Sequence, residues 1–129
     1  MKTQVLRTPV FVLVLLFAAT MATFAGAAST VSARVEYNRD VRPILSDNCF
    51  LCHGPDKNTR KAKLRLDLRE EAVAKEAFIP GKAEESELVK RLFTTEEDDL
   101  MPPPDSHKHL TDLQRDILKR WVAQGAEYQ

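Results

Sequence analysis

Apolar residues recur every three or four positions in three stretches of the chain, 38–48, 84–93 and 111–125. This spacing places them on one face of a helix, which is typical of helices that bury one side. A fourth stretch, 69–77, is helical by composition, and 64–66 (LRL) is too short to separate a strand from an extended segment. The pattern predicts an all-α domain with a helix at each end and long loops between. The apolar positions are Tyr37, Val41, Ile44 and Leu45 in the first stretch, Leu88, Val89, Leu92 and Phe93 in the second, and Leu113, Ile117, Leu118, Trp121 and Val122 in the third.

The last of these stretches has the clearest boundary signals. Thr111 precedes Gln114 by three residues, the spacing of a capping box in which each side chain bonds the backbone N–H of the other. Leu110 is placed to pack against the start of this helix, and Gly125 is a natural residue to end it. We therefore expect a well-defined terminal helix whose Trp121 packs against the first helix or against the edge of a bound cofactor.

The start of the chain differs from the rest. Lys2 and Arg7 are the only charges in residues 1–33, and Val10–Ala19 is almost purely apolar. Small residues follow, in the small-x-Ala pattern of a cleavage site, so 1–33 is interpreted as a secretory signal peptide and 34–129 as the domain. The alternative is an uncleaved membrane anchor. Under either interpretation the domain is exported, to the periplasm or the cell envelope.

Composition limits the function classes open to the domain. The whole chain has 19 basic and 19 acidic side chains, so removing Lys2 and Arg7 leaves the domain mildly acidic, at −2. It has no basic patch with interleaved aromatic residues, which argues against nucleic-acid binding. Only 24 of its 96 residues are Leu, Ile, Val, Phe, Met or Trp. A domain with so small a core is commonly completed by a disulfide, a metal or a cofactor.

Both cysteines of the chain lie in one short segment, Cys49-Phe50-Leu51-Cys52-His53. C-x-x-C-H is the attachment sequence of c-type haem. The spacing lets the two thiols reach the two vinyl groups on one edge of the porphyrin, and it puts the histidine under the iron as the proximal ligand. We therefore predict one covalently attached haem c, held by Cys49, Cys52 and His53. A buried porphyrin would also complete the sparse core.

Two other uses of this segment stay open at the level of sequence. A disulfide or a thioredoxin-like redox pair would suit an exported protein, although the redox pair calls for a βαβ context that the pattern does not indicate. A zinc site would need a further ligand from His107 or His109. The zinc interpretation would make the chain a metal-stabilised binding module without redox function.

The sixth ligand of an iron that only carries electrons would be Met101, the one methionine after position 33. Three prolines follow it, and because they fix the backbone, the loop loses little entropy when it holds a weak thioether ligand. His107 and His109 are alternative ligands, although their polar surroundings favour a solvated role. The acidic run 96–99 lacks the alternation of a calcium loop and is predicted to be solvated. Four basic residues after the motif are candidate partners for the haem propionates or, alternatively, for solvent and acidic neighbours: Arg60, Lys61, Lys63 and Arg65.

The sequence resembles one known family along essentially all of 34–129. The segments YNRDVRPILSDNCFLCHGPD, KAKLRLDLRE, IPGKAEESELVKRL, LMPPPDSHKHLT and RWVAQGAEYQ resemble the planctomycete cytochrome c domain, and the order of elements resembles a class I cytochrome c. The resemblance implies a small helical fold wrapped around one covalently bound haem. It also implies thioether links at Cys49 and Cys52, with His53 as the proximal ligand and Met101 as the distal ligand.

These features together predict an exported monohaem electron carrier, not an enzyme, that serves a redox partner protein or a fused domain. Members of the family usually open a much longer exported protein, so the chain is either a stand-alone carrier or the N-terminal fragment of a multidomain protein. The alternative from another class is a peroxidase-like haem enzyme with an open distal site. In that enzyme Met101 would be unbound, and His107 or His109 would supply acid/base chemistry. Contact with a membrane is predicted only through an N-terminal anchor.

Overall fold

The computed structural model describes residues 34–129. All regular secondary structure in this range is helical, with no strand, which confirms the predicted all-α class. Residues 64–66 belong to an irregular connection. None of the described helices is long and apolar enough to cross a membrane. The predicted leader, 1–33, lies outside the described residues, so its cleavage and its alternative role as an anchor stay predictions.

The first predicted helix is present as two consecutive segments, η2 (Tyr37–Val41) and α1 (Arg42–Asn48). Pro43 lies in the first turn of α1, where its missing N–H leaves no helical hydrogen bond unmade. Leu45 is fully buried, so the predicted apolar stripe faces the core. A one-turn helix, α2 (Phe50–His53), follows directly and packs chiefly against α1.

The two middle helices are shorter than the sequence predicted. Helix α3 (Arg69–Ala74) ends three residues before the predicted limit at 77. Helix α4 (Glu87–Phe93) does not continue from the short 3₁₀ turn η3 (Ala83–Glu85), because Ser86 separates them in an extended conformation. The buried Ser86 hydroxyl bonds two main-chain groups of the preceding loop at 2.8 Å each, and these bonds hold the break in place.

Two residues assigned to the apolar stripes are not buried. Phe93, the last residue of α4, is 49% exposed, and Leu113, in the first turn of α5 (Asp112–Ala123), is 66% exposed. Phe93 is the last residue of α4 and follows the buried Leu92, whereas Leu113 lies in the first turn of α5, ahead of its buried residues. Periodicity alone therefore overestimated how far each buried face extends.

The predicted boundaries of α5 are confirmed. The Gln114 N–H donates to the Thr111 hydroxyl (3.2 Å), and the Thr111 N–H donates to the Gln114 side chain (2.9 Å), which completes the capping box. Gly125 follows the end of the helix with φ of 109°, a left-handed conformation that glycine adopts without steric cost. A short 3₁₀ turn, η4 (Pro104–Ser106), lies in the connection between α4 and α5.

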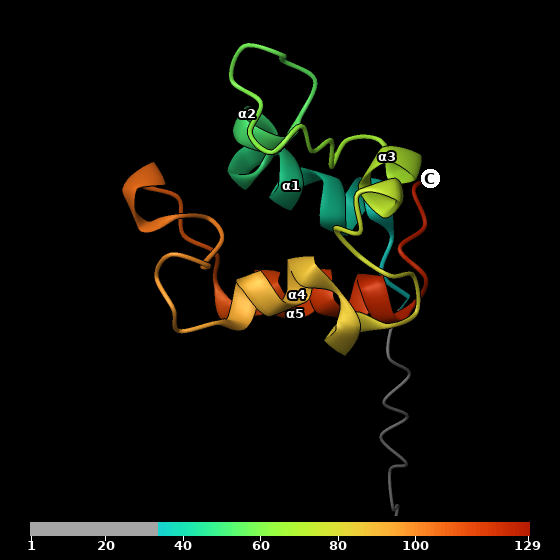
Figure 1. The fold of residues 1–129 in the computed structure, drawn as a ribbon. Helices are drawn as coiled ribbons and strands as arrows, with labels where there is room; N and C mark the ends of the chain where they lie inside the picture. The colour runs from blue at the N-terminus through green and yellow to red at the C-terminus, as the bar shows by residue number, and fades with distance from the viewer. Residues whose placement is uncertain (1–33) are drawn as a thin grey trace, which may run out of the picture. The chain divides into compact units, whose positions relative to one another are not determined.

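The core is centred on Trp121, which is 2% exposed. Its ring lies 5.8 Å from that of Tyr37 in η2 and 5.2 Å from that of Phe78, measured between centroids. Trp121 therefore packs against the first helix, as the sequence predicted. In the view of Figure 1, α1 and α2 lie above the paired helices α4 and α5, and η2 contacts α5.

Candidate haem site

The three residues of the predicted attachment motif are brought together in a single turn. Cys49 ends α1, and its carbonyl accepts hydrogen bonds from the N–H groups of Cys52 (3.1 Å) and His53 (2.7 Å). Residues three and four positions apart in such a turn present their side chains on the same side. The backbone therefore directs two thiols and one imidazole toward one region, as a doubly tethered and ligated group requires.

Gly54 ends this turn through a close backbone approach. A Cβ atom at position 54 would lie 2.3 Å from the Phe50 carbonyl oxygen, so no larger residue fits without a shift of the backbone. Arg60 then donates through Nε to the Gly54 carbonyl (2.8 Å) and through Nη2 to the Pro55 carbonyl (2.6 Å). The Lys61 N–H donates to the Cys52 carbonyl (2.7 Å). The loop after the motif is thereby folded back onto it.

The sequence interpretation did not single out Gly54, although its position directly after the motif was an available signal. Arg60 was expected to pair with a haem propionate or with solvent and acidic neighbours, whereas its guanidinium binds main-chain carbonyls of the loop. Arg65, another such candidate, donates through Nε to the Asp67 carboxylate (3.0 Å). Arg65 thus pairs with an acidic neighbour, the second of the two expected uses, and only the main-chain role of Arg60 was not predicted from the sequence.

The chemical state of the thiols separates the alternative uses of the motif. Cys49 and Cys52 do not form a disulfide with each other in the described chain. Burial, with a smaller contribution from Cys52, raises the pKa of Cys49 to about 12. A thioredoxin-like pair depends on a lowered pKa, so this geometry does not favour a redox pair. Among residues 34–129, no group of three or more His, Cys, Asp or Glu side chains is arranged to hold a metal ion, which disfavours zinc.

The imidazole of His53 is in the state that a metal ligand needs. Burial lowers the pKa of His53, with an opposing contribution from the Lys61 backbone, so the ring is neutral near pH 7 and keeps a free lone pair. Its Nδ1 is buried and meets no hydrogen-bond partner of normal geometry within residues 34–129. An unpartnered buried nitrogen costs about 1–3 kcal/mol, so this ring is where a further binding partner is expected. A buried, protonated Cys49 thiol in the same turn as Cys52 and a neutral, incompletely bonded imidazole fits haem c.

Met101 lies in a different part of the domain, the loop between α4 and η4. Its N–H donates to the Arg91 carbonyl at 2.9 Å, which returns the loop to α4 after the acidic run. The Asp99 and Leu100 N–H groups both donate to the Glu96 carbonyl, so the run forms a turn. Its four carboxylate residues are exposed, as predicted, and only Asp99 pairs with a cation among the described residues, Arg91 at 3.3 Å. Met101 itself is half-buried.

The structure thus brings together Cys49, Cys52 and His53, and it places Met101 separately. No hydrogen bond within residues 34–129 joins the Met101 loop to α2. In Figure 1 the connection that carries Met101 leaves α4 on the left of the view, the side on which α2 also lies. The alternative ligands His107 and His109 are both exposed, which agrees with the solvated role favoured by the sequence.

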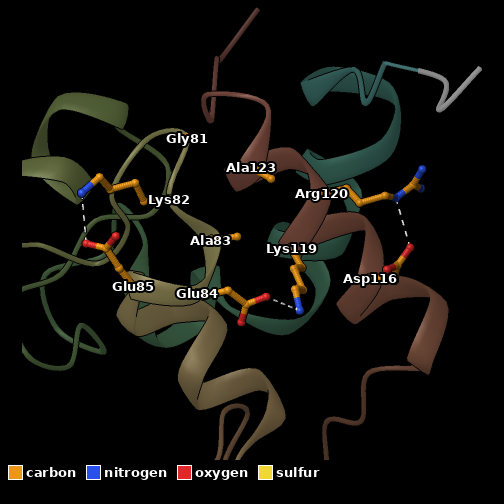
Figure 2. Close-up of a pocket in the computed structure, with 9 residues that line it drawn as sticks. All are labelled: Gly81, Lys82, Ala83, Glu84, Glu85, Asp116, Lys119, Arg120 and Ala123. Carbon is orange, nitrogen blue, oxygen red and sulfur yellow. Dashed lines mark hydrogen bonds and ion pairs between the residues drawn. The ribbon is translucent and has the colours of Figure 1, made fainter.

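A surface depression of the described chain lies elsewhere. It is formed by residues 81–85 and the second half of α5, and its rim carries three ion pairs (Figure 2). Lys119 pairs with Glu84 at 2.6 Å, and two further pairs join neighbouring cations and carboxylates of the same segments. None of the predicted site residues lines it. Its charges balance each other, so this depression is a feature of surface packing, separate from the motif.

Comparison with known families agrees with the geometry. Residues 49–105 match the family model described as planctomycete cytochrome C. The matched segment begins at the first cysteine of the motif and includes Met101. Over this segment the chain is similar to a planctomycete cytochrome c domain. Searches among curated proteins and among solved structures gave no match. A cytochrome c domain indicates haem binding and electron transfer, and an electron carrier in preference to an enzyme.

Proposed function

We propose that this cytochrome c domain transfers electrons through one haem c, attached by thioether bonds to Cys49 and Cys52, with His53 as the proximal and Met101 as the distal iron ligand. The observation that carries the proposal is the single turn holding both thiols and the imidazole, inside the segment that matches the family. Haem, when bound, supplies a one-electron couple between ferrous and ferric iron.

The residues of the chain supply attachment and orientation. Cys49 and Cys52 would each hold the haem by addition of the S–H group across one vinyl group, in which the sulfur would bond to one carbon and the hydrogen to the other, with no net oxidation. The neutral His53 imidazole offers a nitrogen lone pair, and the hydrogen bonds from Lys61 and Arg60 fix the loop around it. Phe50 and Leu64 pack against the core beside the motif and provide apolar surface.

The prolines after Met101 limit the freedom of its loop, and the Arg91 carbonyl fixes its backbone at one point. A thioether ligand stabilises ferrous iron and raises the potential relative to a second imidazole. With both axial positions filled, no substrate would reach the iron, which is the property of a carrier. The peroxidase-like alternative requires an acid/base residue at the distal site, whereas both remaining histidines of the domain are exposed.

The proposal includes export. The leader pattern in 1–33 supports delivery to the periplasm or cell envelope, where c-type haem is attached, and the partner would be a redox protein or a fused domain. Whether the leader is removed or kept as an anchor would be decided by the N-terminal sequence of the protein recovered from the exporting cell.

The function is tested by expressing the chain together with c-type maturation machinery. The wild type is expected to keep its haem through acid-acetone extraction, and Cys49→Ser with Cys52→Ser is expected to lose it. The ferric wild type is expected to show the weak near-infrared band of sulfur-to-iron charge transfer and to exclude carbon monoxide when reduced. Met101→Ala is expected to lose the band and to bind carbon monoxide, while His107→Ala serves as the matched control and should behave as the wild type.

Two outcomes would overturn parts of this proposal. Extractable haem in the wild type would contradict the proposed covalent attachment. A wild type that lacks the near-infrared band and binds carbon monoxide readily would remove Met101 as the ligand, and the peroxidase-like alternative would then become the better interpretation.

A further inference from the structure

The C-terminal tail, 124–129, lies outside the segment that matches the family, yet it is bonded to several distant parts of the domain. Arg69 of α3 donates through Nε to the Ala126 carbonyl at 2.8 Å and pairs with Glu127 at 3.0 Å. The Trp121 indole N–H donates to the Glu127 carbonyl at 3.0 Å. The tail is therefore held in one conformation up to the residue before Tyr128.

Tyr128 is placed by both its ring and its hydroxyl. The ring stacks on Tyr37 with 4.1 Å between centroids and an interplanar angle of 18°. The hydroxyl donates to the Leu66 carbonyl at 2.7 Å, a contact between residues 62 positions apart in the sequence. Burial raises the pKa of Tyr128 above its ordinary value, so the hydroxyl keeps its proton and remains a donor across the physiological range.

Leu66 links the Tyr128 hydroxyl to the haem motif. Its side chain is 2% exposed, and its N–H donates to the His53 carbonyl at 2.8 Å. Two hydrogen bonds in series, from Tyr128 to Leu66 and from Leu66 to His53, therefore connect the tail with the main chain of the histidine. The two bonds meet at opposite ends of one residue, so a displacement of Leu66 would strain or break both.

We infer that Tyr128 is a positioning residue for His53, which it holds through Leu66 in the orientation that the iron requires. The inference rests on the proposed function, because it treats His53 as the proximal ligand. Residues that fix a metal-ligating histidine through its surroundings control ring orientation and the access of solvent to the metal. In this domain that control comes from the last residues of the chain, which meet the motif only in the folded structure.

The test compares Tyr128→Phe with Tyr37→Phe in the haem-loaded protein. Both variants lose one phenol hydroxyl and keep the stacked ring pair, but the Tyr37 hydroxyl makes no hydrogen bond within residues 34–129, so Tyr37→Phe is the matched control. Tyr128→Phe is expected to speed hydrogen exchange of the Leu66 N–H about tenfold, the change that follows from losing one hydrogen bond. It is also expected to lower the reduction potential, because water that reaches the loosened segment favours ferric iron.

A wild-type measurement keeps the inference open to refutation if the variant does not fold. In the wild type the Leu66 N–H should exchange as slowly as the N–H groups of helix α5, and a rate like that of the exposed Lys63 would overturn the inference. Equal exchange rates and equal potentials in the two variants would also overturn it. Failure of the proposed function would show separately, as a wild type that attaches no haem.

Discussion

The structural role of Gly54 depends on its lack of a Cβ atom. Its Cα follows the motif at the point where the chain turns away from α2, and a Cβ there would lie 2.3 Å from a carbonyl oxygen of the same turn. The contact is with backbone, which cannot rotate away as a flexible side chain could. The carbonyl of the same residue accepts a hydrogen bond from Arg60, so a shift at this position would also disturb the loop that covers the motif.

We expect Gly54→Ala to destabilise the haem-loaded protein by about 1–3 kcal/mol, the usual cost of forcing an extra methyl group into a packed site. Urea unfolding followed by circular dichroism would measure it. Gly81→Ala is an informative control, because a Cβ there meets no atom within 4 Å and only the left-handed φ of 81° opposes it. Gly81→Ala should therefore leave the visible spectrum of the haem unchanged, whereas Gly54→Ala should alter it. Equal spectra in both variants would contradict the role given to Gly54.

At the scale of single residues, the sequence predicted the local part of the site and not the distant part. Cys49, Cys52 and His53 are recognisable because their chemistry depends on spacing within one turn. The contact between Tyr128 and Leu66 joins residues 62 positions apart, and neither residue type suggests it. Only the folded chain shows that this pair supports the histidine.

The five α-helices of residues 34–129 differ in how well their first and last residues can be predicted from the residues nearby in the sequence. Helix α5 has a side-chain cap at its start and a left-handed glycine after its end, and both limits were predicted from these residues. The break before α4 depends on Ser86, whose hydroxyl is bonded to main-chain groups of the loop four and seven residues earlier. Apolar periodicity carries no information about such a side-chain bond to an irregular loop, so it missed this limit.

We expect Thr111→Ala to cost about 1 kcal/mol of stability, because the Gln114 N–H would lose its acceptor at the start of α5. Thr111→Ser keeps a hydroxyl and should recover most of the loss. Thr95→Ala is the matched control, since the Thr95 hydroxyl makes no hydrogen bond within residues 34–129 and the residue is exposed. Thermal unfolding of the three variants would give the ranking, and a Thr111→Ala midpoint equal to that of Thr95→Ala would contradict it.

At the scale of the described domain, residues 34–129, the buried aromatic side chains are few and lie together. The buried aromatic residues Tyr37, Phe78 and Trp121 lie where η2 meets α5. Helix α2, by contrast, packs chiefly against α1. The motif is thus supported mainly by α1 and by the loop that follows it, and not by the aromatic cluster, which agrees with the sequence-based expectation that a cofactor completes the core.

We expect the chain with Cys49→Ser and Cys52→Ser to retain no more than about 3–5 kcal/mol of stability, the most that a core of this size commonly supplies. Unfolding of this variant, followed by near-ultraviolet circular dichroism, should occur at a lower urea concentration and over a broader range of concentrations than unfolding of the haem-loaded wild type. Because Trp121 lies in the core around α5, its surroundings should be the last part of the variant to unfold. A variant as stable as the wild type would contradict the view that haem completes the core.

The limited packing of α2 has a consequence for the order in which the protein is made. Without the cofactor, a one-turn helix whose contacts with other helices are chiefly with α1 is expected to open at lower free-energy cost than the core around Trp121. If the chain is exported and matured as proposed, the two thiols would be accessible in that opened segment, where an assembly enzyme would bind it as an extended peptide. Thioether links to both sulfur atoms would then keep the segment from separating from the group it surrounds, and maturation would be irreversible.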